Sequence, residues 1–306
     1  MSPLRRRLAE YLALRRTLGF KLLRAARLLP DFVAYLERHR APTLTTALAL
    51  AWAQQPPAGS PAWWAQRLSL VRGFATYLQA LDAHTEVPPP TLVRSYRPRA
   101  TPYVYSARDL ARLLAAARQL HPRLRAGTYT TLIGLLATTG MRVGEAIRLD
   151  RQDVAWGPRL LIVRDSKFGK SREVPLHDTT TAALRAYAGL RDRSLHARAP
   201  SFFLSTAGTR LIAQNVHCTF LGLVRRAGLE RAARRRPRPH DLRHTFAVRT
   251  VLGWYHAGLD VEARLPLLST YLGHVAPSST YWYLSATPAL MAQAAQRLER
   301  ARGERP

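Results

Sequence analysis

A stretch rich in proline and arginine, from Val87 to Pro102, interrupts the sequence and limits how the chain can fold. It has no apolar periodicity, and its composition favours an extended conformation, so we expect a linker between domains. The chain has 306 residues, which is enough for about two domains of roughly 100–200 residues each. We therefore predict one domain over residues 1–86, a linker over 87–102, and a second domain over 103–306.

The first domain is predicted to be helical throughout. Apolar residues recur at helical spacing from residue 4 to about residue 84. Prolines at residue 42 and between residues 56 and 61 divide this run, and a further helix is expected from Ala62 to Leu81. The pattern favours a small helical bundle with basic residues among its polar positions.

The second domain is predicted to combine helices with one small sheet. Two apolar runs, 160–163 and 172–176, flank the basic segment 165–170 and are typical of a β-hairpin. Gly140 and Gly228 stand where helices are expected to end. The expected helices cover residues 107–120, 128–138, 143–149, 179–191, 212–227, 239–258, 262–272 and 288 onwards. The predicted fold class is mainly α with a small antiparallel β-sheet.

The charge of the chain indicates a polyanionic partner. The formal net charge is +28 and the isoelectric point is about 11.5. Self-repulsion of this size disfavours a compact state unless an anion compensates it. Most of the positive residues are arginines, which bind phosphate through two donors at once. We therefore expect a polyanion, rich in phosphate, as the partner.

Composition also excludes several classes of protein. The single cysteine, Cys218, rules out a disulfide framework and a cysteine-based zinc site, and it fits a reducing cytoplasm. Because Cys218 lies in a periodic helical run, we expect a buried thiol. No apolar run approaches the ~20 residues of a membrane span, and no secretory signal is recognisable. A cytoplasmic protein without a cofactor is expected.

Five residues in the second domain form a set with a definite chemistry. Arg142 lies in Thr139-Gly140-Met141-Arg142-Val143-Gly144-Glu145, and His240 and Arg243 lie in His240-Asp241-Leu242-Arg243-His244-Thr245-Phe246. His274 ends Tyr271-Leu272-Gly273-His274, and Tyr283 follows nine residues later. Two arginines, two imidazoles and a late tyrosine are the groups needed to break a DNA phosphodiester with a phenol as nucleophile.

The same residues admit other interpretations. His240 and His244 stand four apart on a helix, as in a metalloprotease zinc site, with Asp241 in place of the usual glutamate. Surrounding arginines would repel a dication, so no metal is expected; an ordinary core histidine is a further alternative. Glu145 could stabilise a helix N-terminus, or it could accept hydrogen bonds that orient a histidine or an arginine.

Taken together, these motifs resemble those of the tyrosine recombinases, the phage integrase family. The resemblance rests on the segment 139–149, on residues 240–247, and on Leu272-Gly273-His274 followed by Tyr283, and it covers residues 103–290 in order. More weakly, the N-terminal helices are similar to the core-binding domain of that family. The segment Ser279-Thr280-Tyr281-Trp282-Tyr283-Leu284 looks like integrases carried by transposons and other mobile elements.

The resemblance implies a role for each matching residue. Arg142 and Arg243 match the two arginines that bind the non-bridging oxygens, His240 matches the first family histidine, and His274 matches a position held by histidine or tryptophan. Lys167 matches the lysine of the β-hairpin that protonates the leaving oxygen. Phe168 departs from the usual glycine, which keeps Lys170 as an alternative.

Tyr283 matches the nucleophile by its spacing from His274. Tyr281 and Tyr271 are its alternatives, and both are expected instead to pack against neighbouring aromatic residues.

The resemblance further implies site-specific recombination of double-stranded DNA through a 3′-phosphotyrosine, without metal or ATP. It also implies a tetramer that assembles on DNA through the C-terminal helix, residues 288–306. Accessory recombinases or directionality factors are additional expected partners, and the protein would act on the nucleoid. A type IB-like topoisomerase and a non-catalytic DNA-binding regulator are the alternative functions. Basic residues near the hairpin and before His240 are expected to contact DNA: Lys170, Arg172, Arg235, Arg236 and Arg238.

Overall fold

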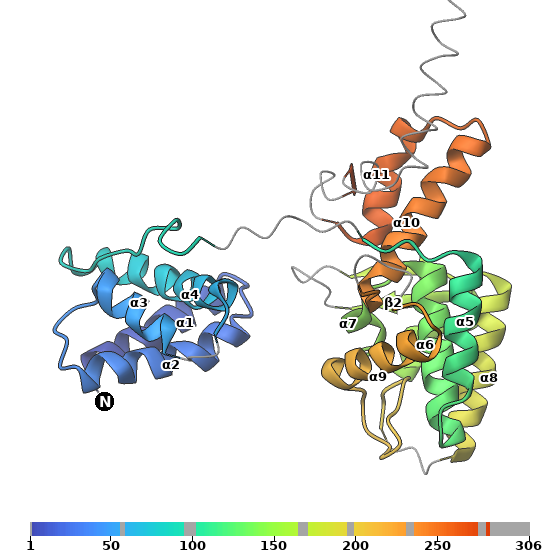
Figure 1. Cartoon of the computed structure of the whole chain (residues 1–306), viewed down its shortest axis with the longest axis horizontal. Helices are drawn as coiled ribbons and strands as arrows, with labels where there is room; N and C mark the ends of the chain where they lie inside the picture. Colours follow the sequence, from blue (N-terminus) through green and yellow to red (C-terminus); the bar gives the residue numbers. More distant parts are fainter. Residues whose placement is uncertain are drawn as a thin grey trace, which may run out of the picture. The chain divides into compact units, whose positions relative to one another are not determined.

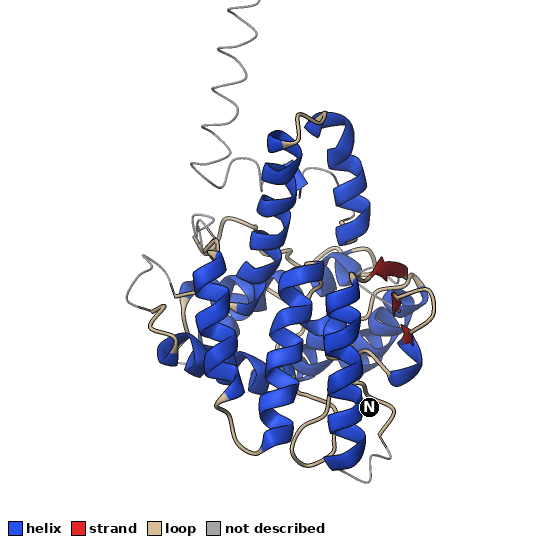
Figure 2. Ribbon diagram, turned by 90° about the vertical axis from the view of Figure 1, so that its right-hand side faces the viewer, coloured by secondary structure: helices blue, strands red, loops and turns tan. Residues whose placement is uncertain are grey.

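The computed structural model describes residues 2–55, 59–94, 102–164, 171–194, 199–230, 236–274 and 280–281. The chain divides into two compact units, Met1–Ala100 and Thr101–Pro306 (Figure 1). Both units are built mainly from helices, and the second also carries a small antiparallel sheet (Figure 2). The predicted fold class is confirmed.

Unit one is a helical bundle with its own core. Its helices are α1 (Pro3–Thr17), α2 (Leu23–Arg38), α3 (Thr46–Gln54) and α4 (Pro61–Gln79). Ser2, Thr45 and Ser60 cap three of them, because each side chain accepts a hydrogen bond from a backbone N–H in the first turn. Apolar stripes from all four helices meet in one cluster around Phe32, Trp52 and Phe74.

Part of the segment expected to be a linker packs onto this bundle. Arg72 of α4 donates from Nε to the carbonyl oxygen of Pro88 over 2.7 Å, and from Nη2 to that of Pro89 over 3.0 Å. Val87, Leu92 and Val93 lie against the core of unit one. Pro88 and Pro89 lie outside any helix, so no helical N–H reaches their carbonyl oxygens, and Arg72 donates to them instead.

Unit two is arranged around α6 (Arg123–Thr139). This helix packs against α5 (Ala107–Arg118), α8 (Asp178–Ser194) and α10 (Pro239–His256). Among the described residues, the remaining regular segments are α7 (Val143–Ala146), the 3-10 turn η1 (Arg151–Asp153), α9 (Ala213–Arg226) and α11 (Val261–Leu272). Leu132, Ile133, Leu135 and Leu136 of α6 belong to the buried cluster of this unit.

The sheet has the strand order β1-β2-β3, with all neighbours antiparallel. Strands β2 (Leu160–Val163) and β3 (Arg172–Pro175) form the predicted hairpin, and Val163 pairs with Arg172 at the end nearest the connection. The hairpin connection, 165–170, lies outside the described residues. Strand β1 (Val154–Ala155) pairs Val154 with Leu161, and the sequence did not predict it because two residues cannot show an alternating pattern.

Two glycines follow the helices that lead into Arg142 and His274. Gly140 follows α6 with φ at 62°, and Gly273 follows α11 with φ at 67°. Both lie in the left-handed region that favours glycine. A Cβ on Gly140 would come within 2.5 Å of the ring of Phe246, so that turn also needs the missing side chain. Arg142 follows Gly140 by two residues, and His274 follows Gly273 directly.

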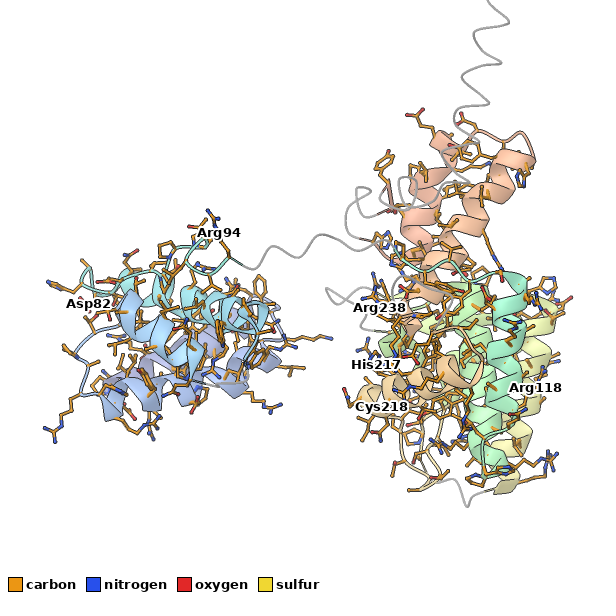
Figure 3. All side chains as sticks on the ribbon, viewed as in Figure 1. Asp82, Arg94, Arg118, His217, Cys218 and Arg238 are labelled. Atoms are coloured by element: carbon orange, nitrogen blue, oxygen red, sulfur yellow. The ribbon has the colours of Figure 1, made fainter. Side chains whose placement is uncertain are left out.

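Cys218 is exposed, and the expectation of a buried thiol was wrong (Figure 3). The buried stripe of α9 runs through Val216, Phe220 and Leu223. Cys218 lies two residues after Val216, and at 100° per residue this turns its side chain away from the core. Among the described residues, no helix combines the length and the apolar character that crossing a bilayer requires.

Candidate active site

Arg142 stands at the junction between α6 and α7, and its side chain is held in two places. Its Nη1 donates to Glu145 Oε1 over 2.7 Å, and its Nη2 donates to the carbonyl oxygen of Gly273 over 3.0 Å. Its backbone N–H donates to Glu145 Oε2 over 3.0 Å, which closes the first turn of α7. The side chain remains 26% exposed. Arg142 thus bridges the start of α7 and the end of α11 while part of its guanidinium faces solvent.

Arg243 joins the ends of two helices from within the protein. It belongs to α10, and it is only 1% exposed. Its Nη1 donates to the carbonyl oxygen of Gly140 over 2.8 Å, and its Nη2 donates to that of Leu272 over 2.7 Å. The last carbonyls of a helix lack intrahelical partners and carry partial negative charge, so one cation stabilises both ends.

His274 lies against Arg243, and the contact fixes its protonation. Arg243 Nη2 and His274 Nε2 are 2.8 Å apart. Because a guanidinium can only donate, Nε2 accepts, and the ring proton is on Nδ1, which donates to Thr280 Oγ1 over 2.8 Å. Burial and the positive charges of Arg243 and Arg142 lower the pKa of His274 to about 4. The imidazole is therefore neutral at physiological pH.

Glu145 is a buried carboxylate shared by two arginines. Its side chain is 1% exposed, and besides Arg142 it accepts from Arg172, over 2.8 Å at Oε2 and 3.2 Å at Oε1. Burial alone would raise the pKa of Glu145, but the hydrogen bonds and charges of Arg172 and Arg142 outweigh it and lower the pKa to about 2. Glu145 both caps α7 and orients arginines, so the two interpretations of this residue apply together.

His240 is exposed in the first turn of α10, three residues before Arg243. Its ring lies edge-on to that of His244, with centroids 4.8 Å apart. Asp241 accepts the backbone N–H of Arg238 over 2.8 Å, so it caps the helix. Within the described parts of the chain, no group of three or more His, Cys, Asp or Glu residues is placed to hold a metal ion.

The basic residues expected at DNA occupy different environments. Arg238, labelled in Figure 3, pairs with Asp241, and Arg236 pairs with Glu230 over 2.8 Å. Arg172 is turned inward, with its side chain 13% exposed. Lys167, Lys170 and Arg235 lie outside the described residues.

The three candidate tyrosines also differ. Tyr271 is stacked on Phe246 with ring centroids 5.6 Å apart, and burial raises its pKa to about 12. Tyr281, which was expected to pack, is 48% exposed. Tyr283 lies outside the described residues. Sequence reasoning did not single out Thr280, which is buried against His274, because no motif marks it.

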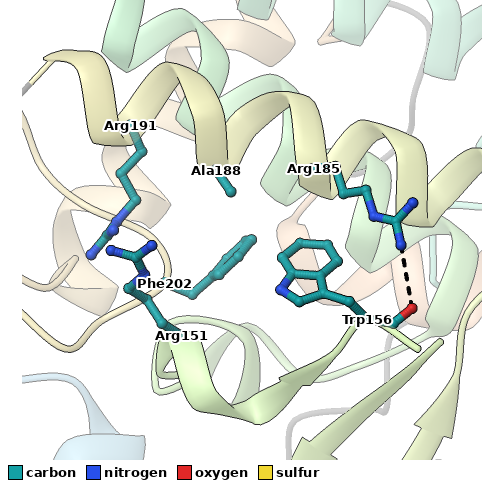
Figure 4. Close-up of a pocket in the computed structure, with 6 residues that line it drawn as sticks. All are labelled: Arg151, Trp156, Arg185, Ala188, Arg191 and Phe202. Atoms are coloured by element: carbon teal, nitrogen blue, oxygen red, sulfur yellow. Dashed lines mark hydrogen bonds between the residues drawn. The ribbon is translucent and has the colours of Figure 1, made fainter. Parts of the chain in front are cut away.

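A separate hollow of about 300 Å³ lies beside α8 (Figure 4). The rings of Trp156 and Phe202 face it, with Arg151, Arg185 and Arg191 around them. Asp192 pairs with both Arg151 and Arg191. None of the residues predicted for the site lines this hollow.

The chain is similar to known proteins over the region that contains these motifs. The chain matches the phage integrase family over residues 104–289. It is 47% identical to the putative integrase/recombinase y4rB of Sinorhizobium fredii (strain NBRC 101917 / NGR234), over 98% of each chain. It is 33% identical to the tyrosine recombinase XerD of Rhizobium meliloti (strain 1021), over 72% of this chain and 68% of XerD. A solved structure of the Tn1549 transposon integrase in complex with a circular intermediate DNA has a similar fold, with a TM-score of 0.65 and 17% identity over 96% of this chain and 99% of that one.

Proposed function

This chain belongs to the phage integrase family and is a tyrosine recombinase, and on that premise we propose how its residues carry out site-specific recombination of DNA. Arg142 and Arg243 bind the non-bridging oxygens of the scissile phosphate. His274 lies beside Arg243, and it adds a contact to the same phosphate once Nε2 carries the ring proton in place of the bond that it accepts from Arg243. His240, exposed one helical turn before Arg243, helps to remove the phenol proton from Tyr283 or holds the phosphate.

The arginines address the main obstacle of the reaction. A phosphodiester repels nucleophiles because it is anionic, and its transition state gathers more charge on the equatorial oxygens. Donors placed in advance at these oxygens stabilise that charge, and removing one such donor commonly costs about 10²–10³ in rate. The donors here are guanidiniums held by protein carbonyls, so their orientation does not depend on the substrate.

Proton transfer and covalent bonding complete the step. The phenol oxygen of Tyr283 attacks phosphorus, and the bond to the 5′ oxygen breaks. Lys167 protonates this leaving oxygen, with Lys170 as the alternative donor, a contribution of roughly 10²–10⁴ in rate. The products are a 3′-phosphotyrosine and a free 5′ hydroxyl. Because the bond energy is retained, a 5′ hydroxyl of another strand can attack and rejoin DNA without ATP.

The rest of the molecule supplies binding and assembly in this proposal. The domain of residues 1–86 and the segment 87–102 add phosphate contacts on the duplex, and residues 103–306 carry the chemistry. The segment 288–306 joins copies of the chain into a tetramer on paired sites, and accessory recombinases or directionality factors act with it. The place of action is the nucleoid in the cytoplasm.

One observation supports this assignment above the others. Arg142 is more than 100 residues from Arg243 and His274 in the sequence, yet the three side chains meet at the ends of α6 and α11. The convergence of two guanidiniums and an imidazole provides a site for a tetrahedral anion. It also links all three motifs that carry the family resemblance.

A nicked suicide substrate carrying the element's junction tests the proposal, because loss of the short 5′ fragment traps the covalent protein–DNA adduct. The wild type and Y281F are expected to form an SDS-resistant adduct, whereas Y283F binds DNA with unchanged affinity and forms none. An adduct that persists in Y283F would show that another residue is the nucleophile. Relaxation of any supercoiled plasmid by a monomer would favour the topoisomerase alternative.

A further inference from the structure

Arg172 is the first residue of β3, and its guanidinium reaches from the hairpin to two other elements. Its Nη2 and Nη1 donate to the Glu145 carboxylate over 2.8 and 3.2 Å, and its Nε donates to the carbonyl oxygen of Tyr271 over 2.9 Å. Each of the three nitrogens therefore already has a protein acceptor. The side chain is 13% exposed, and the Nη1–Nη2 fork that would bind a phosphate through two donors already faces the Glu145 carboxylate.

We propose that Arg172 is a positioning residue that acts through Glu145 on Arg142 and ties the catalytic hairpin to the end of α11. This inference rests on the proposed function, because it takes Arg142 as a ligand of the scissile phosphate. It replaces the expectation that Arg172 contacts DNA.

The charges around Glu145 explain why a second arginine is needed there. A buried carboxylate with Arg142 as its only partner would pair with it through both oxygens and cancel its charge. Arg172 occupies one site on each oxygen. Arg142 then needs to give only Nη1 to the carboxylate, and its Nη2 remains directed toward Gly273. Two guanidiniums and one carboxylate keep one net positive charge, which attracts a phosphate.

The turn after α11 is shaped to admit this side chain. A Cβ on Gly273 would lie 3.0 Å from Nη1 of Arg172, closer than nearly all real contacts of this kind. The same glycine gives its carbonyl oxygen to Arg142. Arg172 therefore holds the carbonyl of Tyr271 just before this turn, and Arg142 holds that of Gly273 within it.

Two variants of Arg172 test the proposal on the full chain, with R118A as a matched loss of one exposed positive charge outside the site. For each, the DNA dissociation constant is measured as a function of salt, and the single-turnover cleavage rate is measured on the suicide substrate at saturating DNA. Small misplacements of catalytic groups commonly cost up to about 100-fold. We expect R172Q to cleave roughly 10- to 100-fold more slowly, with affinity and salt dependence like those of R118A.

R172K provides the conservative rescue. The ammonium of lysine retains the charge but cannot reproduce the planar fork that serves Glu145 and Tyr271 together. We expect a cleavage rate between those of the wild type and R172Q. Wild-type cleavage by R172Q at saturating DNA would overturn the proposal. So would a loss of affinity with a salt slope lower by about 1, which is the signature of a phosphate contact.

A double variant keeps the test valid if R172Q does not fold. E145Q/R172Q removes the carboxylate that would otherwise be left buried, so it is compared with E145Q alone. The proposal expects the two to cleave at similar rates, because Arg172 acts through Glu145. A further tenfold drop in the double variant would overturn it. If the wild type itself forms no adduct, the proposed function fails, and that result is distinct from every outcome for Arg172.

Discussion

Arg243 shows how one buried side chain can serve both folding and chemistry. It satisfies the last carbonyls of α6 and α11, and it holds His274 in the tautomer with the proton on Nδ1. Replacing it by lysine keeps the charge but cannot span both carbonyls. A buried carbonyl without a donor costs about 1–3 kcal/mol.

We predict that R243K lowers the free energy of unfolding by about 1–3 kcal/mol and the single-turnover cleavage rate by about 10²–10³. Thermal unfolding and the suicide substrate measure the two effects. R249K is the matched control, because Arg249 is exposed on the same helix and its Nη2 donates to the carbonyl oxygen of Tyr105 over 2.9 Å. Equal stability and rate for R243K and R249K would contradict this role.

Glu145 gives the molecule an acid-sensitive contribution to stability. Its pKa falls from an ordinary value of 4.5 to about 2 in the folded state. A lowered carboxyl pKa stabilises the fold above pH 4.5, and the contribution is lost as pH falls from 4.5 toward 2. For this buried group it amounts to about 3 kcal/mol.

We therefore predict that the stability of E145Q varies less with pH than that of the wild type between pH 4.5 and 2. Denaturant unfolding at several pH values measures the difference. Because the pKa of His274 is lowered from 6.5 to about 4 in the folded state, the unfolded state binds the proton first. The fold therefore also loses stability at this residue as pH falls from 6.5 toward 4. E145Q should retain the pH dependence that comes from His274. Identical pH profiles for the two proteins would contradict the buried ion-pair network.

At the scale of elements, the turn after α11 is where Arg142 and Arg172 both approach the backbone. Gly273 is left-handed, its carbonyl oxygen binds Arg142, and its Cα faces Arg172. Gly258, which ends α10 with φ at 70°, has no atom within 4 Å of its virtual Cβ. An added side chain would strain the backbone at both glycines, but only at Gly273 would it also crowd Arg172.

We predict that G273A and G258A both lose about 1 kcal/mol of stability, whereas only G273A loses cleavage, by roughly 10- to 100-fold. Thermal unfolding and single-turnover cleavage separate the two effects. A cleavage defect of the same size in G258A would mean that helix strain alone, and not the contact with Arg172, matters.

The sequence predicted elements better than it predicted directions of side chains. The helices of both units and the strands β2 and β3 follow from periodicity and from the glycines that end helices, and the family resemblance is confirmed. Strand β1 was too short to show a pattern. Cys218 was misplaced because a thiol in a helix does not by itself show which way it faces, and the inward direction of the Arg172 side chain was not predicted for the same reason. Thr280 meets His274 only through the fold.

At the scale of the whole molecule, charge governs the encounter with DNA. The net charge of +28 is spread over both units of the chain. Binding through phosphate contacts releases counterions, so log K falls with log salt by about 0.9 per neutralised phosphate.

We predict that affinity for duplex DNA falls by about 10³–10⁵ between roughly 50 and 200 mM salt, as expected for about 6–10 phosphate contacts. Fluorescence anisotropy across a salt series gives the slope. R118A should leave the slope nearly unchanged if Arg118, exposed on α5, lies away from the duplex. An affinity that hardly responds to salt would contradict electrostatic binding as the dominant contribution.

The most direct test of the central claim is to identify the amino acid that becomes attached to DNA. The adduct captured on the suicide substrate, in the presence of a chelator, is digested with protease and nuclease and analysed by mass spectrometry. The account predicts a 3′-nucleotide on the peptide that contains Tyr283, in the same yield with and without chelator. Attachment to another residue, or a yield that depends on an added divalent ion, would contradict it.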